Sequence, residues 1–172
     1  SQDGYSELIL GGSTTAQPVT IYSHVSGRWT VMHDSIKINA TSLEVFDFDK
    51  DGDSDLFISG RRLDNNLLVS AVYDNERGLR FTPSEIFPAI EGHTSLADLD
   101  HDGNFDIVLA GKDTSAQNHS LALLNHGNSF QVKDTLMRLE QIKVVAADFN
   151  ANGKCDLHYY GYTSSGDTIN VI

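Results

Sequence analysis

The sequence predicts an all-β protein built from a unit of about 50 residues that recurs along the chain. An acidic loop around a glycine occurs three times, as "FDFDKDGDSDLFISG" (46–60), "LADLDHDGNFDIVLAG" (96–111) and "AADFNANGKCDLHYYG" (146–161). Short runs such as "SLEVF", "LFISG", "LLVSAVY" and "LRFTPSEIF" are rich in β-branched and aromatic residues, as strands are. No stretch keeps a helical period of 3.6 residues over three turns.

The repeat extends beyond the acidic loop. The loop glycines Gly52, Gly103 and Gly153 are spaced by 51 and 50 residues, and Gly4 marks a truncated opening copy. Each glycine is followed three residues later by an acid, then by an apolar residue, a further glycine and, in three copies, a turn ending in Trp29, Phe81 or Phe130. The expected units are residues 1–44, 45–95, 96–145 and 146–172.

Four short strands in about 50 residues is the size of one blade of a β-propeller. We name the strands of a unit A to D, with the acidic loop between A and B. On this labelling the chain supplies strands B, C and D of a first antiparallel blade, followed by two complete blades. It then supplies strands A and B of a last blade, with enough residues left for strand C. We expect a single domain over residues 1–172, a partial or open propeller of about three and a half blades.

The acidic loops have the ligand spacing of a calcium site. Numbered from Asp47, side-chain oxygens fall at positions 1, 3, 5 and 9, glycine stands at position 6, and position 7 offers its backbone carbonyl. Dense hard oxygen ligands select Ca²⁺, which would also relieve the repulsion between the acids. A true EF-hand is excluded, because position 12 is Ile58 or Leu109 and the flanks are strands.

The three loops differ in their charge. The first two have four acids each at the side-chain positions, whereas the third has two acids and two amides, so we expect two calcium sites and a third, weaker one. Ordinary Asp/Gly turns are the alternative, which three copies at fixed spacing disfavour. The opening copy keeps Asp3 and Glu7 and is not expected to bind. The predicted metal residues are Asp47, Asp49, Asp51, Asp53, Asp55, Asp98, Asp100, Asp102, Asn104, Asp106, Asp148, Asn150, Asn152, Lys154 and Asp156.

Composition excludes several classes of partner and site. The formal net charge of −12 argues against nucleic acid and anionic membranes, and no apolar run is long enough to span a bilayer. The seven histidines and the single cysteine show no spacing typical of a zinc site. We expect no catalytic residues, since every tight Asp cluster is already part of a calcium loop and no nucleophile motif is present.

These motifs resemble the FG-GAP and VCBS class of repeats, found in integrin α-subunit propellers and in many bacterial surface and secreted proteins. The resemblance rests on D-x-[DN]-x-[DN]-G-x-x-D before an apolar strand that ends in glycine, and on the later turn "NHGNSF". It implies a propeller, commonly seven-bladed, with Ca²⁺ in the A–B loops at positions 1, 3, 5, 7 and 9. The signatures that name the integrin type are missing, so the resemblance is closer to the VCBS style and implies no integrin ligand.

The expected function is a calcium-stabilised binding or adhesion module that recognises a protein or a glycan. Because moderate calcium sites fill only where free Ca²⁺ is high, we expect an extracellular, cell-surface or periplasmic location. The alternatives are a segment of a secreted polysaccharide lyase and a structural spacer. Three and a half blades cannot close a seven-bladed ring, so we expect a segment of a longer protein; self-association through open strand edges is the alternative.

Overall fold

The computed structural model describes residues 6–12, 18–32, 36–76, 78–127, 129–135, 139–163 and 165–171, and in these ranges it contains strands and no helix. The prediction of an all-β fold is therefore confirmed. The strands are β1 (Leu8–Leu10), β2 (Thr20–Val25), β3 (Arg28–Val31), β4 (Ile38–Phe46), β5 (Asp55–Arg62), β6 (Leu68–Asn75), β7 (Phe81–Ile86), β8 (Glu91–Ala97), β9 (Asp106–Lys112), β10 (Asn118–Asn125), β11 (Phe130–Thr135), β12 (Glu140–Ala147), β13 (Asp156–Tyr162) and β14 (Thr168–Val171).

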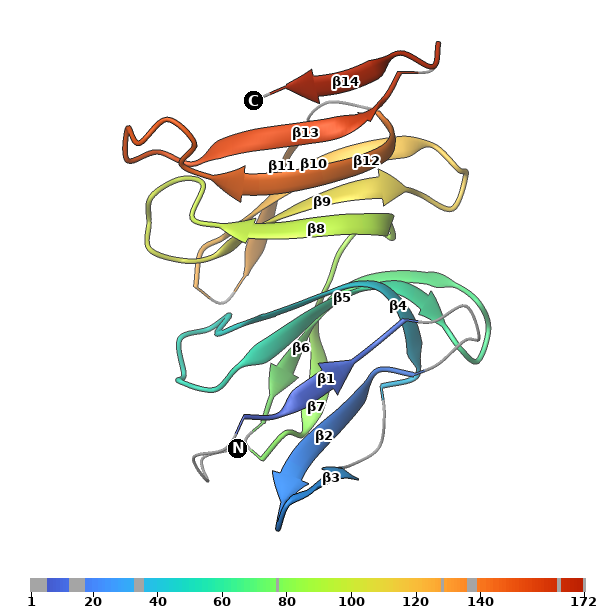
Figure 1. Cartoon of the computed structure of the whole chain (residues 1–172), viewed down its shortest axis with the longest axis vertical. Helices are drawn as coiled ribbons and strands as arrows, with labels where there is room; N and C mark the ends of the chain where they lie inside the picture. Colours follow the sequence, from blue (N-terminus) through green and yellow to red (C-terminus); the bar gives the residue numbers. More distant parts are fainter. Residues whose placement is uncertain are drawn as a thin grey trace.

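The strands form four antiparallel sheets, and in each sheet consecutive strands pair with one another. The sheets are β1–β3, β4–β7, β8–β11 and β12–β14, so the described strands number three, four, four and three per sheet, as the sequence predicts. The sheets follow one another in chain order along the long axis of the molecule, from β1–β3 at one end to β14 at the other (Figure 1). Each acidic loop joins the first two strands of its sheet.

The two four-stranded sheets each share one central strand between two hydrophobic cores. In β5, Leu56 and Ile58 pack toward Val19, which lies just before β2, whereas Phe57 packs toward Ile107 of the third sheet. All three β5 residues are fully buried. Alternate residues of a strand point to opposite faces, so the uninterrupted apolar run of β5 shows that both faces of this sheet are covered.

The same arrangement recurs in β9. Ile107 and Leu109 face the second sheet, and Val108 and Ala110 face the last sheet, where they pack with Val144. The described chain therefore contains three cores, each between neighbouring sheets.

A glycine near the end of β5 and another near the end of β9 are required by a close approach of two backbones. A Cβ atom on Gly60 would lie 2.2 Å from the backbone oxygen of Asn39 on β4, and one on Gly111 would lie 2.2 Å from that of Glu91 on β8. A side chain at either position would force the paired strand away.

No helix in the described ranges is long and apolar enough to cross a membrane.

Candidate metal centre

Each acidic loop is shaped by left-handed backbone at two positions. The glycine at position 6 has a φ of 92° at Gly52, 83° at Gly103 and 81° at Gly153. Position 4 is also left-handed, at Lys50, His101 and Ala151, with φ between 57° and 63°. The sequence predicted the glycine turn, but nothing in the identity of Lys, His or Ala indicated the second left-handed residue.

The first acid of each loop closes the turn by accepting from the glycine. The backbone N–H of Gly52 donates to Oδ2 of Asp47 over 3.1 Å, and the same bond joins Gly103 to Asp98 over 3.1 Å. In the third loop Gly153 donates to Asp148 over 2.8 Å. One carboxylate oxygen of each position-1 acid therefore holds the loop backbone.

The last acid of each loop is the most deeply placed. Asp55 and Asp106 are 1% and 0% exposed. Asp55 Oδ2 accepts the N–H of Phe48 over 2.7 Å, and Asp106 Oδ2 accepts that of Leu99 over 2.6 Å. Asp156 makes the corresponding bond to Phe149 over 3.1 Å but is only partly buried. Position 9 thus ties the end of the loop back to its second residue.

The structure brings positions 1, 3 and 9 together in the first two loops. One carboxylate oxygen from each of Asp47, Asp49 and Asp55 lies within 4.8 Å of the other two, and Asp98, Asp100 and Asp106 form the same group. Asp51 at position 5 is turned toward the backbone, because its Oδ1 accepts the N–H of Asp53 over 2.8 Å.

The remaining predicted residues of these loops make local contacts. Asp102 Oδ1 accepts the N–H of Asn104 over 2.8 Å, and Asn152 Oδ1 accepts that of Lys154 over 2.7 Å. The position-7 residues therefore use their N–H groups inside the loop. In the third loop Asn150 donates its amide to Asp156 over 2.9 Å. Asp3, from the truncated opening copy, lies outside the described residues.

The first loop fits a hard cation, and the second has the same three acids, although Oδ1 of Asp98 already accepts the N–H of Asp102 over 3.1 Å. Oδ1 of Asp47 is buried and has no hydrogen-bond partner, whereas its Oδ2 accepts the N–H of Gly52 and Oδ1 of Asp49 accepts that of Asp51. A buried carboxylate oxygen without a partner is costly, and a bound cation removes that cost. The donors are carboxylate oxygens, which suit Ca²⁺ or Mg²⁺ rather than soft metals.

Electrostatics in these loops also favour a bound cation. Burial raises the pKa of Asp55 above its usual range, the nearby Asp49 and Asp74 add to the shift, and the hydrogen bonds from Asn75 and Phe48 oppose it. Burial likewise raises the pKa of Asp106, with contributions from Asp100 and Asp102. Each deep carboxyl is therefore harder to ionise than an exposed aspartate, and a bound cation would favour its ionised form.

Sequence reasoning missed two asparagines that complete these loops. The backbone N–H of Asn75 donates to Oδ1 of Asp55 over 2.9 Å, and that of Asn125 donates to Oδ1 of Asp106 over 2.8 Å. Both asparagines end the third strand of their sheet. Their recurrence after an apolar strand, 20 and 19 residues beyond the acid, was the available signal. A third carboxylate group, formed by Asp100 and Asp102 with the exposed His126, was also not expected.

Comparison with known families supports the repeat assignment. The model of the FG-GAP-like repeat matches residues 47–109, which run from the first acid of the first loop through the second loop into β9. No curated protein matches the chain significantly. The matched segment contains both three-carboxylate groups with a deep position-9 acid. Residues 47–109 are therefore an FG-GAP-type repeat, which confirms the resemblance stated from the sequence.

Proposed function

We propose that this chain is a calcium-stabilised β-propeller module that binds a protein or glycan ligand outside the cell. The observation that carries the proposal is the buried, unpartnered Oδ1 of Asp47 beside the carboxylates of Asp49 and Asp55. Repeats of the FG-GAP type are often calcium-binding, which agrees with the donor set.

The residues that would hold the ion are Asp47, Asp49 and Asp55 in the first loop and their counterparts Asp98, Asp100 and Asp106 in the second. Calcium supplies positive charge that neutralises the clustered acids and cross-links the two strands of the hairpin. The protein's own contribution is to place the deep acid, which the N–H groups of Phe48 and Asn75 orient in the first loop. The role is structural.

The third loop is proposed as a weaker site. It offers two carboxylates, Asp148 and Asp156, and the amide of Asn150 already donates to Asp156. Fewer charged ligands lower calcium affinity. Asp156 is also less buried than Asp55, so less is gained by neutralising it.

A propeller of one domain is the architecture that fits these sheets best. Four antiparallel sheets stack in chain order through shared central strands, which is the relation between neighbouring blades. The acidic loops that join the first and second strands would then lie on one face. An extracellular or periplasmic setting follows from the calcium proposal, and repeats of this family typically occur in extracellular proteins.

A thermal melt in about 1 mM Ca²⁺ against a chelator tests the calcium role. A site with a dissociation constant of about 10 µM adds about 2.7 kcal/mol at that concentration, equivalent to about 5–10 °C for a chain of this size. The double variant that carries both Asp49→Ala and Asp100→Ala should lose the rise in melting temperature. The control variant Asp64→Ala, at an acid outside the loops, should keep it. An unchanged melting temperature in the wild type would contradict the proposal.

The binding role needs a separate measurement. Glycan and extracellular-protein panels should be screened in Ca²⁺, with the same panels in chelator as the control. Ligands retained only in Ca²⁺ would support a calcium-stabilised binding face. A protein that is stabilised by Ca²⁺ and retains no ligand would instead be a structural spacer.

A further inference from the structure

The third acidic loop contains the one asparagine of the chain that glycine follows directly, in the pair Asn152–Gly153. Attack of the backbone nitrogen of Gly153 on the side-chain amide of Asn152 would close a five-membered ring. Glycine has no Cβ to hinder this approach. Asn152 is exposed, so water reaches its side chain, whereas Asn75 and Asn125 are buried, at 6% and 1% exposure. The pair therefore has the covalent arrangement in which an asparagine loses its amide.

Two hydrogen bonds hold the groups that would react. The backbone N–H of Lys154 donates to Oδ1 of Asn152 over 2.7 Å, which polarises the side-chain carbonyl and favours negative charge on its oxygen. The N–H of Gly153 donates to Oδ2 of Asp148 over 2.8 Å, so a carboxylate draws the proton away from the attacking nitrogen. The loop thus makes the carbonyl a better electrophile and the nitrogen a better nucleophile.

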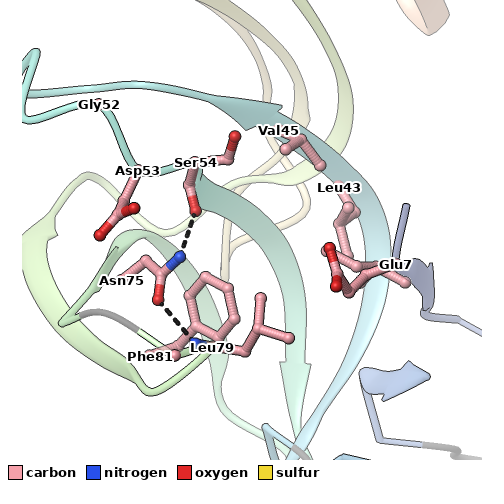
Figure 2. Close-up of a pocket in the computed structure, with 11 residues that line it drawn as sticks. Glu7, Leu43, Val45, Gly52, Asp53, Ser54, Asn75, Leu79 and Phe81 are labelled. Atoms are coloured by element: carbon pink, nitrogen blue, oxygen red, sulfur yellow. Dashed lines mark hydrogen bonds between the residues drawn. The ribbon is translucent and has the colours of Figure 1, made fainter. Parts of the chain in front are cut away.

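The first two loops show that an aspartate fits at this place. Oδ1 of Asp51 accepts the N–H of Asp53 over 2.8 Å, and the second loop has the same bond over 2.8 Å. Figure 2 shows Gly52 and Asp53 as they lead from the first loop toward β5. An aspartate in place of Asn152 keeps the oxygen that accepts the position-7 N–H, so the third loop can retain its shape.

We propose that Asn152 is a site of spontaneous deamidation, and that the resulting aspartate gives the third loop the position-5 acid of the first two. The nitrogen of Gly153 bonds to Cγ of Asn152, the bond from Cγ to Nδ2 breaks, and Nδ2 leaves as ammonia with the proton of the Gly153 N–H. Water then opens the five-membered imide. Opening at Cγ gives aspartate, and opening at the backbone carbonyl gives isoaspartate, which lengthens the backbone by one carbon.

The change adds negative charge to the loop that has the least. Asp148 and Asp156 are the acids at its side-chain positions, so an acid at position 5 raises their number from two to three. More charged ligands raise calcium affinity. The isoaspartate form displaces Gly153 from Asp148 and should bind calcium less well. These effects on calcium rest on the proposed function, whereas the loss of the amide does not.

The deamidation is measured on the folded 172-residue protein. The protein is kept in chelator at physiological temperature and mildly alkaline pH, and samples are digested with trypsin under mildly acidic conditions. The tryptic peptide VVAADFNANGK, residues 144–154, contains Asn152 and also Asn150, which alanine follows. Mass spectrometry with fragmentation identifies which asparagine has become an acid. A freshly purified sample gives the starting value, and the isolated peptide of the same sequence sets the length of the incubation.

Asn152 should be converted at least about tenfold faster than Asn150, because the Cβ of the alanine hinders ring closure. The amide of Asn150 is also held by its hydrogen bond to Asp156 over 2.9 Å. Aspartate and isoaspartate should both form. The proposal is overturned if Asn150 is converted as fast as Asn152, or if Asn152 stays intact in the protein while the isolated peptide is converted.

Isothermal titration of Asn152→Asp with Ca²⁺ measures the consequence for binding. This variant should show a tighter third site than the freshly purified wild type. Gln131→Glu, which adds the same charge at an exposed position of β11, should not. An unchanged third site in Asn152→Asp, with the first two sites filled, would refute the effect on calcium. Absence of binding in every loop would contradict the proposed function and leave the deamidation result standing.

Discussion

Asp55 accepts a hydrogen bond from the backbone N–H of Asn75 over 2.9 Å, across 20 residues of chain. Its second oxygen accepts the N–H of Phe48, so one buried carboxylate joins the acidic loop, the start of β5 and the end of β6. The acid is therefore part of the framework of the sheet as well as a candidate metal ligand.

Removal of this carboxylate should destabilise the protein even without calcium. Asp55→Ala leaves two buried N–H groups unsatisfied, and at about 1–3 kcal/mol each the free energy of unfolding should fall by about 2–6 kcal/mol. Chemical denaturation in a chelator measures the loss. Asp51→Ala, at an exposed acid of the same loop, should cost less than about 1 kcal/mol. Equal losses for the two variants would mean that the buried bonds contribute little.

The effect of pH should reverse when calcium is added. In metal-free buffer the pKa of Asp55 is raised by burial, so the folded protein binds the proton more tightly than the unfolded chain. The stability due to this group is fully present below the unfolded pKa of about 3.9 and is lost as pH rises through the higher folded pKa. Ca²⁺ binds the ionised form and should add stability over the same rise in pH.

This pH effect can be isolated by comparison with Asp55→Asn, which cannot titrate at that position. The measured quantity is the free energy of unfolding of the wild type minus that of the variant, from pH 4 to 7. Without metal the difference should decrease with rising pH, and in Ca²⁺ it should increase. A difference that does not change with pH would show that Asp55 has the same pKa in both states.

The third loop should gain affinity from one added carboxylate. Asn150→Asp restores the acid found at position 3 of the other loops and removes the amide that donates to Asp156. More charged ligands raise calcium affinity, so isothermal titration should show a tighter third site. Asn170→Asp adds the same charge in β14 outside the loops and should leave the titration unchanged.

The central strands should be the least tolerant of truncation. Phe57 is fully buried and contacts Phe87 with ring centroids 5.8 Å apart, so Phe57→Ala should cost about 3–5 kcal/mol. Ile86→Ala removes a side chain that is 75% exposed and should cost less than about 0.5 kcal/mol. Denaturant unfolding of the two variants compares the two positions directly.

The strands and their number per sheet could be predicted because the repeat shows them several times. A single run such as "LFISG" is ambiguous, but its recurrence after the same acidic loop fixes its place in a sheet. The approach of positions 1, 3 and 9 also follows from spacing, since the loop returns on itself around Gly52. Local patterns were therefore sufficient for these features.

Contacts between sheets could not be predicted in the same way. The bond from Asn125 to Phe48 joins residues 77 positions apart, and no local pattern encodes which sheet face meets which. The position-5 acids Asp51 and Asp102 were placed among the ligands by spacing alone, whereas their oxygens accept backbone N–H groups within the loop. The backbone N–H of the turn and a bound ion compete for the same carboxylate oxygen, and which of them it contacts depends on the geometry of the loop, which the sequence does not specify.

The shared central strands have a consequence for cooperativity. Leu56 and Phe57 are neighbours in sequence yet belong to different cores, so loss of β5 removes support from the sheets on both sides. Stability is then a series of nearest-neighbour couplings, as in linear repeat arrays. Amide hydrogens should exchange most slowly in β5 and β9 and fastest in the outer strands β3 and β14, so the molecule should lose its order from its ends toward its middle.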